Sequence, residues 1–133
     1  MKYIGDIPKD LRYTKEHEWV RIEDSEGTIG ITDYAQHALT DVVFVELPAI
    51  GKNVQQFKPL CIVESVKSVS DVFSPLSGNV FEVNNMITDS PESVNKEPYG
   101  NGWIAKIKIM DESETKNLMK AEDYKKYLEG LVH

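Results

Sequence analysis

The sequence contains few of the residues on which catalytic or metal sites are built. Its 133 residues include a single cysteine, Cys61, which excludes an internal disulfide framework and fits a reducing compartment. The three histidines lie far apart, and none belongs to an HExxH or CxxC-type arrangement, so a zinc site has no support. GxSxG, Walker A and GxGxxG motifs are also missing. The sequence therefore does not indicate a self-sufficient catalyst.

Long apolar runs and positive charge are scarce as well. No run approaches the roughly 18 apolar residues that suggest a membrane span, and residues 1–11 lack the apolar core of a signal peptide. Fifteen basic and 22 acidic residues give a net charge of -7, which disfavours binding to nucleic acid or to anionic membranes. We expect a cytoplasmic, bacterial-type monomer, with a processed organellar form as the alternative. A partner with a basic docking surface stays open.

Short β-prone segments, separated by proline and glycine, make up most of the chain. Alternating apolar and polar residues or dense β-branched runs predict strands at residues 18–23, 28–31, 42–47, 60–65, 69–73, 79–83 and 103–109. Many short strands with this punctuation are typical of an all-β sandwich or barrel with small helices added. A length of 133 residues suffices for one domain. We expect a loose leader at residues 1–10, a β core at 11–110 and a helical segment at 111–133.

Three helical stretches are predicted from capping residues and apolar spacing. Thr32 or Asp33 caps a short helix that runs to Leu39. Ser90 as N-cap, with Pro91 at the first helical position, predicts one or two turns to about residue 96. The last helix carries an amphipathic stripe at Ala121, Tyr124, Leu128 and Leu131.

A lysine occupies the tip of the most tightly spaced strand pair. The strands at 60–65 and 69–73 are so close that they require a tight turn at Val66 and Lys67. Two-residue hairpin turns favour Asn-Gly, Asp-Gly or Gly-Gly, and none of these is present. Such a departure from local rules is expected where function needs the side chain itself. A hairpin tip projects the Lys67 amine for modification, although an exposed lysine also serves simply to keep a sheet edge soluble.

Several separated motifs together resemble the glycine cleavage system H protein family. VESVKSVSD at residues 63–71, followed by SPLSG at 74–78, is similar to the family's lipoyl-attachment segment. Further matches are YTKEHEWV at 13–20, GITDYA at 30–35, DVVFVELP at 41–48 and PYGNGW at 98–103. Their order and spacing agree with the family over about residues 11–130.

The resemblance implies a mainly β, hybrid barrel-sandwich fold with short helices and a C-terminal helix. It also implies that lipoic acid is attached to the amine of Lys67 and that the protein is a carrier rather than an enzyme. In this family the lipoyl group takes up the aminomethyl group of glycine from the P-protein, a glycine decarboxylase. It carries that group to the T-protein, an aminomethyltransferase, and the L-protein, a dihydrolipoyl dehydrogenase, reoxidises it. Lipoate-attaching enzymes are implied as further partners.

Three acidic residues are candidates for a role around the arm. Glu18 and Asp71 lie in closely matching motifs, and either carboxylate can hold the ammonium of the aminomethyl cargo, or both are ordinary solvated acids. Glu64, three residues before the lysine, is expected to be a recognition point for the lipoate-attaching enzyme and for partners. The chain departs from the family pattern at Ser68, where alanine is usual, and at Thr40, where glycine is usual.

Other functions remain open at this level. Within carriers, the alternatives are a lipoyl or biotinyl carrier of another complex and a relay protein that donates lipoate to other carriers. Biotin carriers usually have methionines on both sides of the lysine, unlike Val66 and Ser68 here. From another class, an enzyme with a Schiff-base lysine needs a desolvated pocket, whereas a hairpin tip is exposed. Cys61 lies in an apolar run and is expected to be a buried structural thiol.

Overall fold

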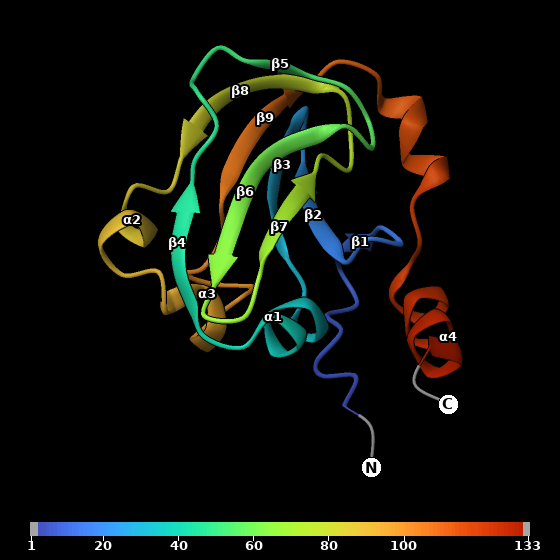
Figure 1. The fold of residues 1–133 in the computed structure, drawn as a ribbon. Coiled ribbons are helices and arrows are strands. Elements are labelled where there is room, and N and C mark those ends of the chain that lie inside the picture. The colour runs from blue at the N-terminus through green and yellow to red at the C-terminus, as the bar shows by residue number, and fades with distance from the viewer. Residues whose placement is uncertain (1–2, 132–133) are drawn as a thin grey trace.

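The computed structural model of the chain describes residues 3–131, which form two antiparallel sheets (Figure 1). The larger sheet has the strand order β1-β2-β3-β9-β8-β5, and the smaller has the order β4-β6-β7. The strands are β1 Arg12–Tyr13, β2 Glu18–Glu23, β3 Glu26–Ile31, β4 Val42–Glu46, β5 Asn53–Val54, β6 Pro59–Ser65, β7 Val69–Phe73, β8 Gly78–Val83 and β9 Ala105–Ile109. The helices are α1 Asp33–Leu39, α2 Met86–Asp89, α3 Ser93–Lys96, the 3₁₀ helix η1 Glu112–Asn117 and α4 Ala121–Leu131.

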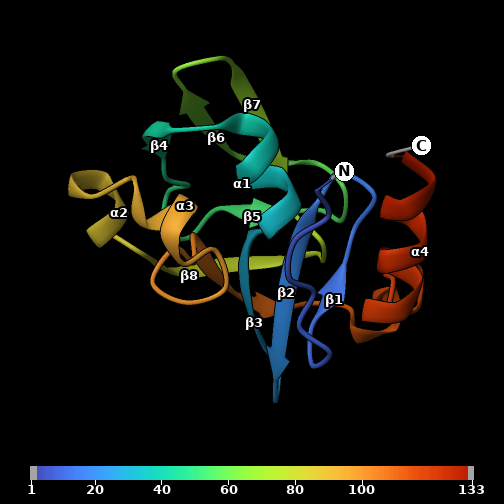
Figure 2. The same cartoon turned by 90° about the horizontal axis from the view of Figure 1, so that it is seen from below.

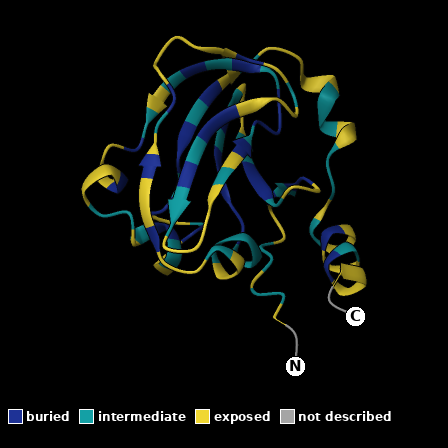
Figure 3. Ribbon diagram, viewed as in Figure 1, coloured by how far each residue is buried: buried dark blue, intermediate teal, exposed yellow. Residues whose placement is uncertain are grey.

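The main hydrophobic core lies between the two sheets. In the smaller sheet Val45 of β4 pairs with Val63 of β6, and both side chains point into this core. In β9, Ala105 and Ile107 are buried, whereas Lys108 between Ile107 and Ile109 is exposed. The alternation read from the sequence therefore matches the burial along β9 (Figure 3), and the mainly β barrel-sandwich fold is confirmed.

The helix after β3 is capped as predicted. Thr32 is the N-cap of α1, and its hydroxyl accepts a hydrogen bond from the Ala35 N–H at 3.2 Å. This satisfies one of the free N–H groups at the helix start and fixes where α1 begins. The helix lies beside the end of the small sheet that carries the β6–β7 hairpin tip (Figure 1).

The prediction for residues 90–96 is wrong in its start. Ser90 ends the helix α2, which the sequence did not indicate, and its N–H donates to the Met86 carbonyl at 2.9 Å. The next helix, α3, begins only at Ser93. Ile87 in α2 and Val94 in α3 are both fully buried. Packing of these two side chains, one on each side of Pro91, therefore sets where the two short helices form.

A second apolar cluster joins both ends of the chain. Tyr124 and Leu128 of α4 are fully buried against β1 and β2, where they meet Leu11, Tyr13 and Trp19. Figure 2 shows α4 alongside β1, on the side away from α2 and α3. Leu131, predicted on the same apolar stripe, is 49% exposed, which corrects that position.

Residues 3–10, predicted as a loose leader, instead pack on this cluster. They form neither helix nor strand, but Ile4 and Ile7 are partly buried against it. The Asp6 N–H donates to Asp33 Oδ2 at 2.9 Å, and the Tyr13 hydroxyl donates to the Pro8 carbonyl at 2.5 Å. These partners are far away in sequence or depend on tertiary packing, so local composition does not reveal them.

Thr40 ends α1 in a backbone conformation that suits glycine. Its φ of 64° and ψ of -150° lie where a β-branched side chain is strained. We expect Thr40→Gly to raise the free energy of unfolding by about 1 kcal/mol, because the relieved strain exceeds the added entropy of the unfolded chain. Urea unfolding of both proteins measures this difference. An equal or lower stability of the variant contradicts the strain assigned to Thr40.

Candidate functional site

The β6–β7 hairpin tip places Lys67 at its apex. Glu64 of β6 pairs with Val69 of β7, and the Ser65 N–H donates to the Ser68 carbonyl at 2.8 Å, which leaves Val66 and Lys67 as the two tip residues. The Ser65 hydroxyl accepts from the N–H groups of Lys67 at 3.1 Å and Ser68 at 3.0 Å. Neither tip residue is among the described residues with positive φ. A serine side chain thus closes the turn without the glycine that favoured hairpin turns use.

The tip is also tied to the rest of the protein. The Val66 N–H donates to the Asp41 carbonyl at 3.0 Å, next to the start of β4. The Lys67 side chain is exposed, and its Nζ donates to the Ala38 carbonyl in α1 at 3.4 Å. The Lys67 amine is therefore placed on a hairpin that is anchored to its neighbours, close to the C-terminal turn of α1.

A cavity of about 220 Å³ opens beside this position, and we call it the arm cavity. It is lined by residues from β2, β3, α1, β6 and β7 and from the loop before β2: Glu16, His17, Glu18, Ile31, Tyr34, Ala35, Ala38, Leu39, Val63, Ser70, Asp71 and Val72. Ala38, whose carbonyl accepts from Lys67, belongs to its wall. The structure thus brings Glu18 and Asp71 to one cavity near the lysine, whereas Glu64 does not line it.

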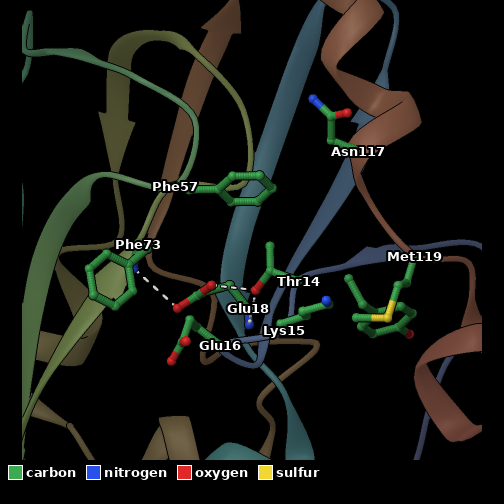
Figure 4. A pocket seen from close by; sticks show the side chains of 9 residues that line it. Thr14, Lys15, Glu16, Glu18, Phe57, Phe73, Asn117 and Met119 are labelled. Atoms are coloured by element: carbon green, nitrogen blue, oxygen red, sulfur yellow. Dashed lines mark hydrogen bonds between the residues drawn. The ribbon is translucent and has the colours of Figure 1, made fainter. Parts of the chain in front are cut away.

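Glu18 is a buried carboxylate without a cation beside it. Its side chain is 1% exposed; the Thr14 hydroxyl donates to Oε1, and the Phe73 N–H donates to Oε2 at 3.1 Å (Figure 4). Neither of the two ion pairs among residues 3–131 involves it. Burial raises the pKa of Glu18 to about 7, although both hydrogen bonds favour the charged form. A carboxyl group in this state gains from any cation that enters the cavity.

A second and larger cavity lies on the other side of Glu18. It measures about 470 Å³, and Phe57, Phe73 and Met119 supply apolar parts of its wall (Figure 4). Glu16 and Glu18 line both cavities. Among residues 3–131, the side chain of Lys67 hydrogen-bonds to Ala38 of the arm cavity and to no residue lining the larger cavity, so the greater size of that cavity does not make it the better site for a group on Lys67.

His17 connects the arm cavity to the C-terminal helix. Its Nδ1 lies 2.9 Å from the Tyr124 hydroxyl, which is also 2.8 Å from the Thr32 hydroxyl. Burial lowers the pKa of His17 to about 4, so the ring is neutral at pH 7. A neutral imidazole adds no positive charge to compete with a cation near Glu18.

Cys61 and Lys67 do not have the surroundings of catalytic nucleophiles. Cys61 is 8% exposed, and burial raises the pKa of its thiol to about 12, which confirms the predicted structural thiol. Lys67 is exposed at its tip, unlike the desolvated lysine of a Schiff-base enzyme.

Within residues 3–131, no three His, Cys, Asp or Glu side chains group closely enough to hold a metal ion. No helix in that part of the chain is long and apolar enough to cross a membrane.

Comparison with known proteins agrees with this geometry. The family model described as Glycine cleavage H-protein matches residues 11–130. The chain belongs to that family. A glycine cleavage system H protein of Carboxydothermus hydrogenoformans is 48% identical over 92% of this chain and 95% of its own length. One from Endomicrobium trichonymphae is 52% identical over 90% of this chain and 97% of its own length.

A solved structure of the H-protein family shares the fold. The crystal structure of a glycine cleavage system H protein from Mycobacterium marinum superposes with a TM-score of 0.79 at 37% identity. The match covers 89% of this chain and 95% of the Mycobacterium marinum chain. The family, and with it the role of H proteins as carriers in a multi-enzyme system, is therefore established for this chain by sequence and by fold.

Several wall residues of the arm cavity were not predicted. Ala35, Ala38 and Leu39 of α1 face the cavity although none has a reactive side chain. Ala38 contacts Lys67 through its backbone carbonyl, and every residue has such a carbonyl, so the amino-acid sequence alone does not predict this contact. Thr14, whose hydroxyl donates to Glu18, lies four residues before it, and the turn between β1 and β2 brings the two together.

Proposed function

We propose that this protein is a lipoyl-bearing shuttle of glycine cleavage, with the lipoyl group in amide linkage to Lys67. The observation that carries the proposal is the hydrogen bond from the exposed Lys67 amine to Ala38, which lines a cavity that also holds the buried carboxyl group of Glu18. An anchored tip fixes the root of a long arm, while the arm itself stays free to reach other proteins. Such a protein acts as a carrier substrate of the system's enzymes and has no reaction of its own.

The residues of the arm cavity fit a lipoyl group. Ile31, Val63 and Leu39 offer apolar contacts for a chain of methylenes. When bound, the lipoyl group supplies a disulfide that accepts the aminomethyl group of glycine and is reduced as it does so. The carboxylates of Glu18 and Asp71 then lie in the cavity where the cargo's ammonium is sheltered from water.

Glu18 discriminates between the loaded and the empty arm by charge. With its pKa near 7, the buried carboxyl is divided between protonated and charged forms at neutral pH. An ammonium nearby favours the charged form, so Glu18 gives up its proton when the cargo enters and holds the cargo through a charge-assisted contact. The oxidised arm is neutral and gains nothing from that charge.

The partners follow from the same proposal. The P-protein loads the arm, the T-protein unloads it to tetrahydrofolate with release of ammonia, and the L-protein reoxidises the dihydrolipoyl group with NAD. Glu64 lies on the hairpin, outside the arm cavity, as a contact for the lipoate-attaching enzyme or for these partners. A cytoplasmic location fits this set of partners.

Removing either carboxylate from the arm cavity is expected to expose the cargo. Glu18→Gln and Asp71→Asn keep the side-chain shape and remove the charge. We expect purified, cargo-loaded protein to lose its aminomethyl group roughly fivefold faster in at least one variant, because a charge-assisted contact is worth on the order of 1 kcal/mol. The measurement is the rate of loss without partner enzymes, followed by mass spectrometry.

A matched control separates this effect from a change in net charge. Glu23 lies in the same strand as Glu18 but is exposed and outside both cavities, so Glu23→Gln is expected to lose cargo at the wild-type rate. Unchanged loss in both cavity variants, with lipoylation intact, removes Glu18 and Asp71 from the mechanism.

A further inference from the structure

Helix α1, which supplies part of the arm-cavity wall, depends on polar contacts for its position. None of its seven residues is buried, and Tyr34, Ala35 and Leu39 are only partly covered by the two apolar clusters. The Thr32 cap fixes its first turn. Its last turn, which brings Ala38 to the cavity wall, lies beside α3 (Figure 2). The contacts between this last turn and α3 therefore decide where the wall stands.

Asn95 of α3 joins the last turn of α1 to the start of β4. Its Oδ1 accepts from the Val42 N–H at 2.8 Å, and its Nδ2 donates to the Thr40 carbonyl at 2.8 Å. The same Nδ2 donates to Gln36 Oε1 at 3.0 Å. The oxygen and both N–H groups of this side chain are therefore engaged by three separate partners.

The orientation of these amides is fixed by groups that cannot exchange roles. The Val42 N–H only donates and the Thr40 carbonyl only accepts, so the Asn95 oxygen faces β4 and its nitrogen faces α1. Gln36 then turns its oxygen to Asn95 and its nitrogen to the carboxylate of Asp33, at 2.7 Å. An aspartate in place of Asn95 keeps the acceptor but has no donor, so only an amide satisfies all three partners.

The end of α1 and the loop to β4, which Asn95 holds, also contact the hairpin tip. The Asp41 carbonyl accepts from the Val66 N–H at 3.0 Å. The Ala38 carbonyl accepts from Lys67 Nζ at 3.4 Å. Acylation leaves one N–H on that nitrogen, so the modified side chain is still a donor for the same carbonyl. The position of the α1 end therefore sets the position of the root of an arm on Lys67.

We propose that Asn95 is a positioning residue for the arm: it fixes the end of α1 against the hairpin tip. The inference rests on the proposed function, which gives the arm cavity its role. Asn95 does not line the cavity, so its effect passes through Thr40 to Ala38 and the rest of the last turn. Without the two N–H donors this turn loses these links to α3, and the wall that shelters the cargo opens to water more often.

Asn95→Asp separates the donor contacts from the rest of the fold. The substitution keeps the shape and the acceptor for the Val42 N–H, and it removes both donors to α1. Asn85→Asp is the matched control, because Asn85 is exposed, its side chain forms no capping bond and the net charge changes equally. Adding Gln36→Lys to Asn95→Asp is expected to restore the link, since a lysine ammonium donates both to Asp33 and to the introduced carboxylate.

Solvent exchange of single amide protons, measured by NMR on the unmodified chain, reports the local effect. We expect the Thr40 and Val66 amides, both hydrogen-bonded in this region, to exchange about fivefold faster in Asn95→Asp. The Ile104 amide, hydrogen-bonded within the main core, is expected to keep its rate. A purely structural role of Asn95 raises all three exchange rates together, because it lowers the stability of the whole domain.

Loss of the aminomethyl group from purified, loaded protein reports the consequence for the arm. We expect Asn95→Asp to lose its cargo about threefold faster than the wild type, measured by mass spectrometry without partner enzymes. The double variant with Gln36→Lys and the control Asn85→Asp are expected to stay near the wild-type rate.

The outcomes separate this inference from the carrier function. Unchanged exchange at Thr40 and Val66 overturns it, and so does faster exchange at all three amides. Faster local exchange with wild-type cargo loss also overturns it, because the contact then does not serve the arm. Absence of lipoyl attachment to Lys67 in the wild-type protein contradicts the carrier function itself, while the exchange rates still decide whether Asn95 holds the end of α1. If Asn95→Asp does not fold, Gln36→Met removes the same contact from the α1 side and takes its place.

Discussion

Replacing Lys67 with arginine is expected to abolish lipoylation and to reduce glycine-dependent carbon dioxide exchange to the level without this protein. Arginine keeps the positive charge and much of the length, but its guanidinium does not provide an amine for acylation. The side chain is exposed, and the turn is held by the Ser65 hydroxyl and by backbone groups. The free energy of unfolding should therefore change by no more than about 0.5 kcal/mol.

Two measurements test the Lys67→Arg variant. Reconstituted exchange with purified P-protein reports the loss of function, and urea unfolding reports the stability. Substantial exchange by the variant contradicts attachment at Lys67. A large loss of stability instead shows that the lysine side chain supports the hairpin, in contrast to the geometry seen here.

Glu18 is expected to make the protein less stable as the pH rises from about 5 to 8, relative to the variant Glu18→Gln. Its folded pKa of about 7 lies above the ordinary value of 4.5, so the folded state binds more protons than the unfolded state between these pH values. The free energy of unfolding then falls as the pH rises through this interval. The gap between 4.5 and about 7 corresponds to about 3 kcal/mol at full ionisation.

The comparison with Glu18→Gln is needed because the titration of His17 changes the stability in the opposite direction as the pH rises. Its pKa is lowered to about 4, so acid below its ordinary value of 6.5 favours the unfolded state. Subtracting the variant's stability from that of the wild type at each pH isolates Glu18, since glutamine does not titrate. Glu23→Gln, at an exposed position of the same strand and outside both cavities, is the control and should run parallel to the wild type. Parallel profiles for Glu18→Gln as well contradict the burial assigned to the carboxyl group.

The sheet structure was predictable because its signals are local. Each β9 side chain faces the core or the solvent according to its parity, and Thr32 caps α1 through an atom three residues from its partner. Lys67 was predicted at the tip because two strands with so few residues between them can be joined only by a tight turn. The sequence did not show how Ser65 replaces glycine, since that depends on the rotamer of one hydroxyl.

The environment of the site was less predictable because it depends on long-range packing. Glu18 and Phe73 are 55 residues apart, and only the folded core brings the Phe73 N–H to the carboxylate. The exposure of both Val43 and Phe44 comes from a register shift between β4 and β6 that alternation alone does not reveal. The Ser90–Pro91 signal failed for a related reason, since burial of Ile87 created a helix upstream.

Site mapping of lipoylation tests the central assignment most directly. The purified protein is modified by a lipoate-attaching enzyme, digested, and its peptides are assigned by tandem mass spectrometry. The carrier function and the exposed, anchored hairpin tip predict one lipoyl group, on the peptide that contains Lys67 and on that lysine alone. A lipoyl group on another lysine, with Lys67 free, contradicts the assignment.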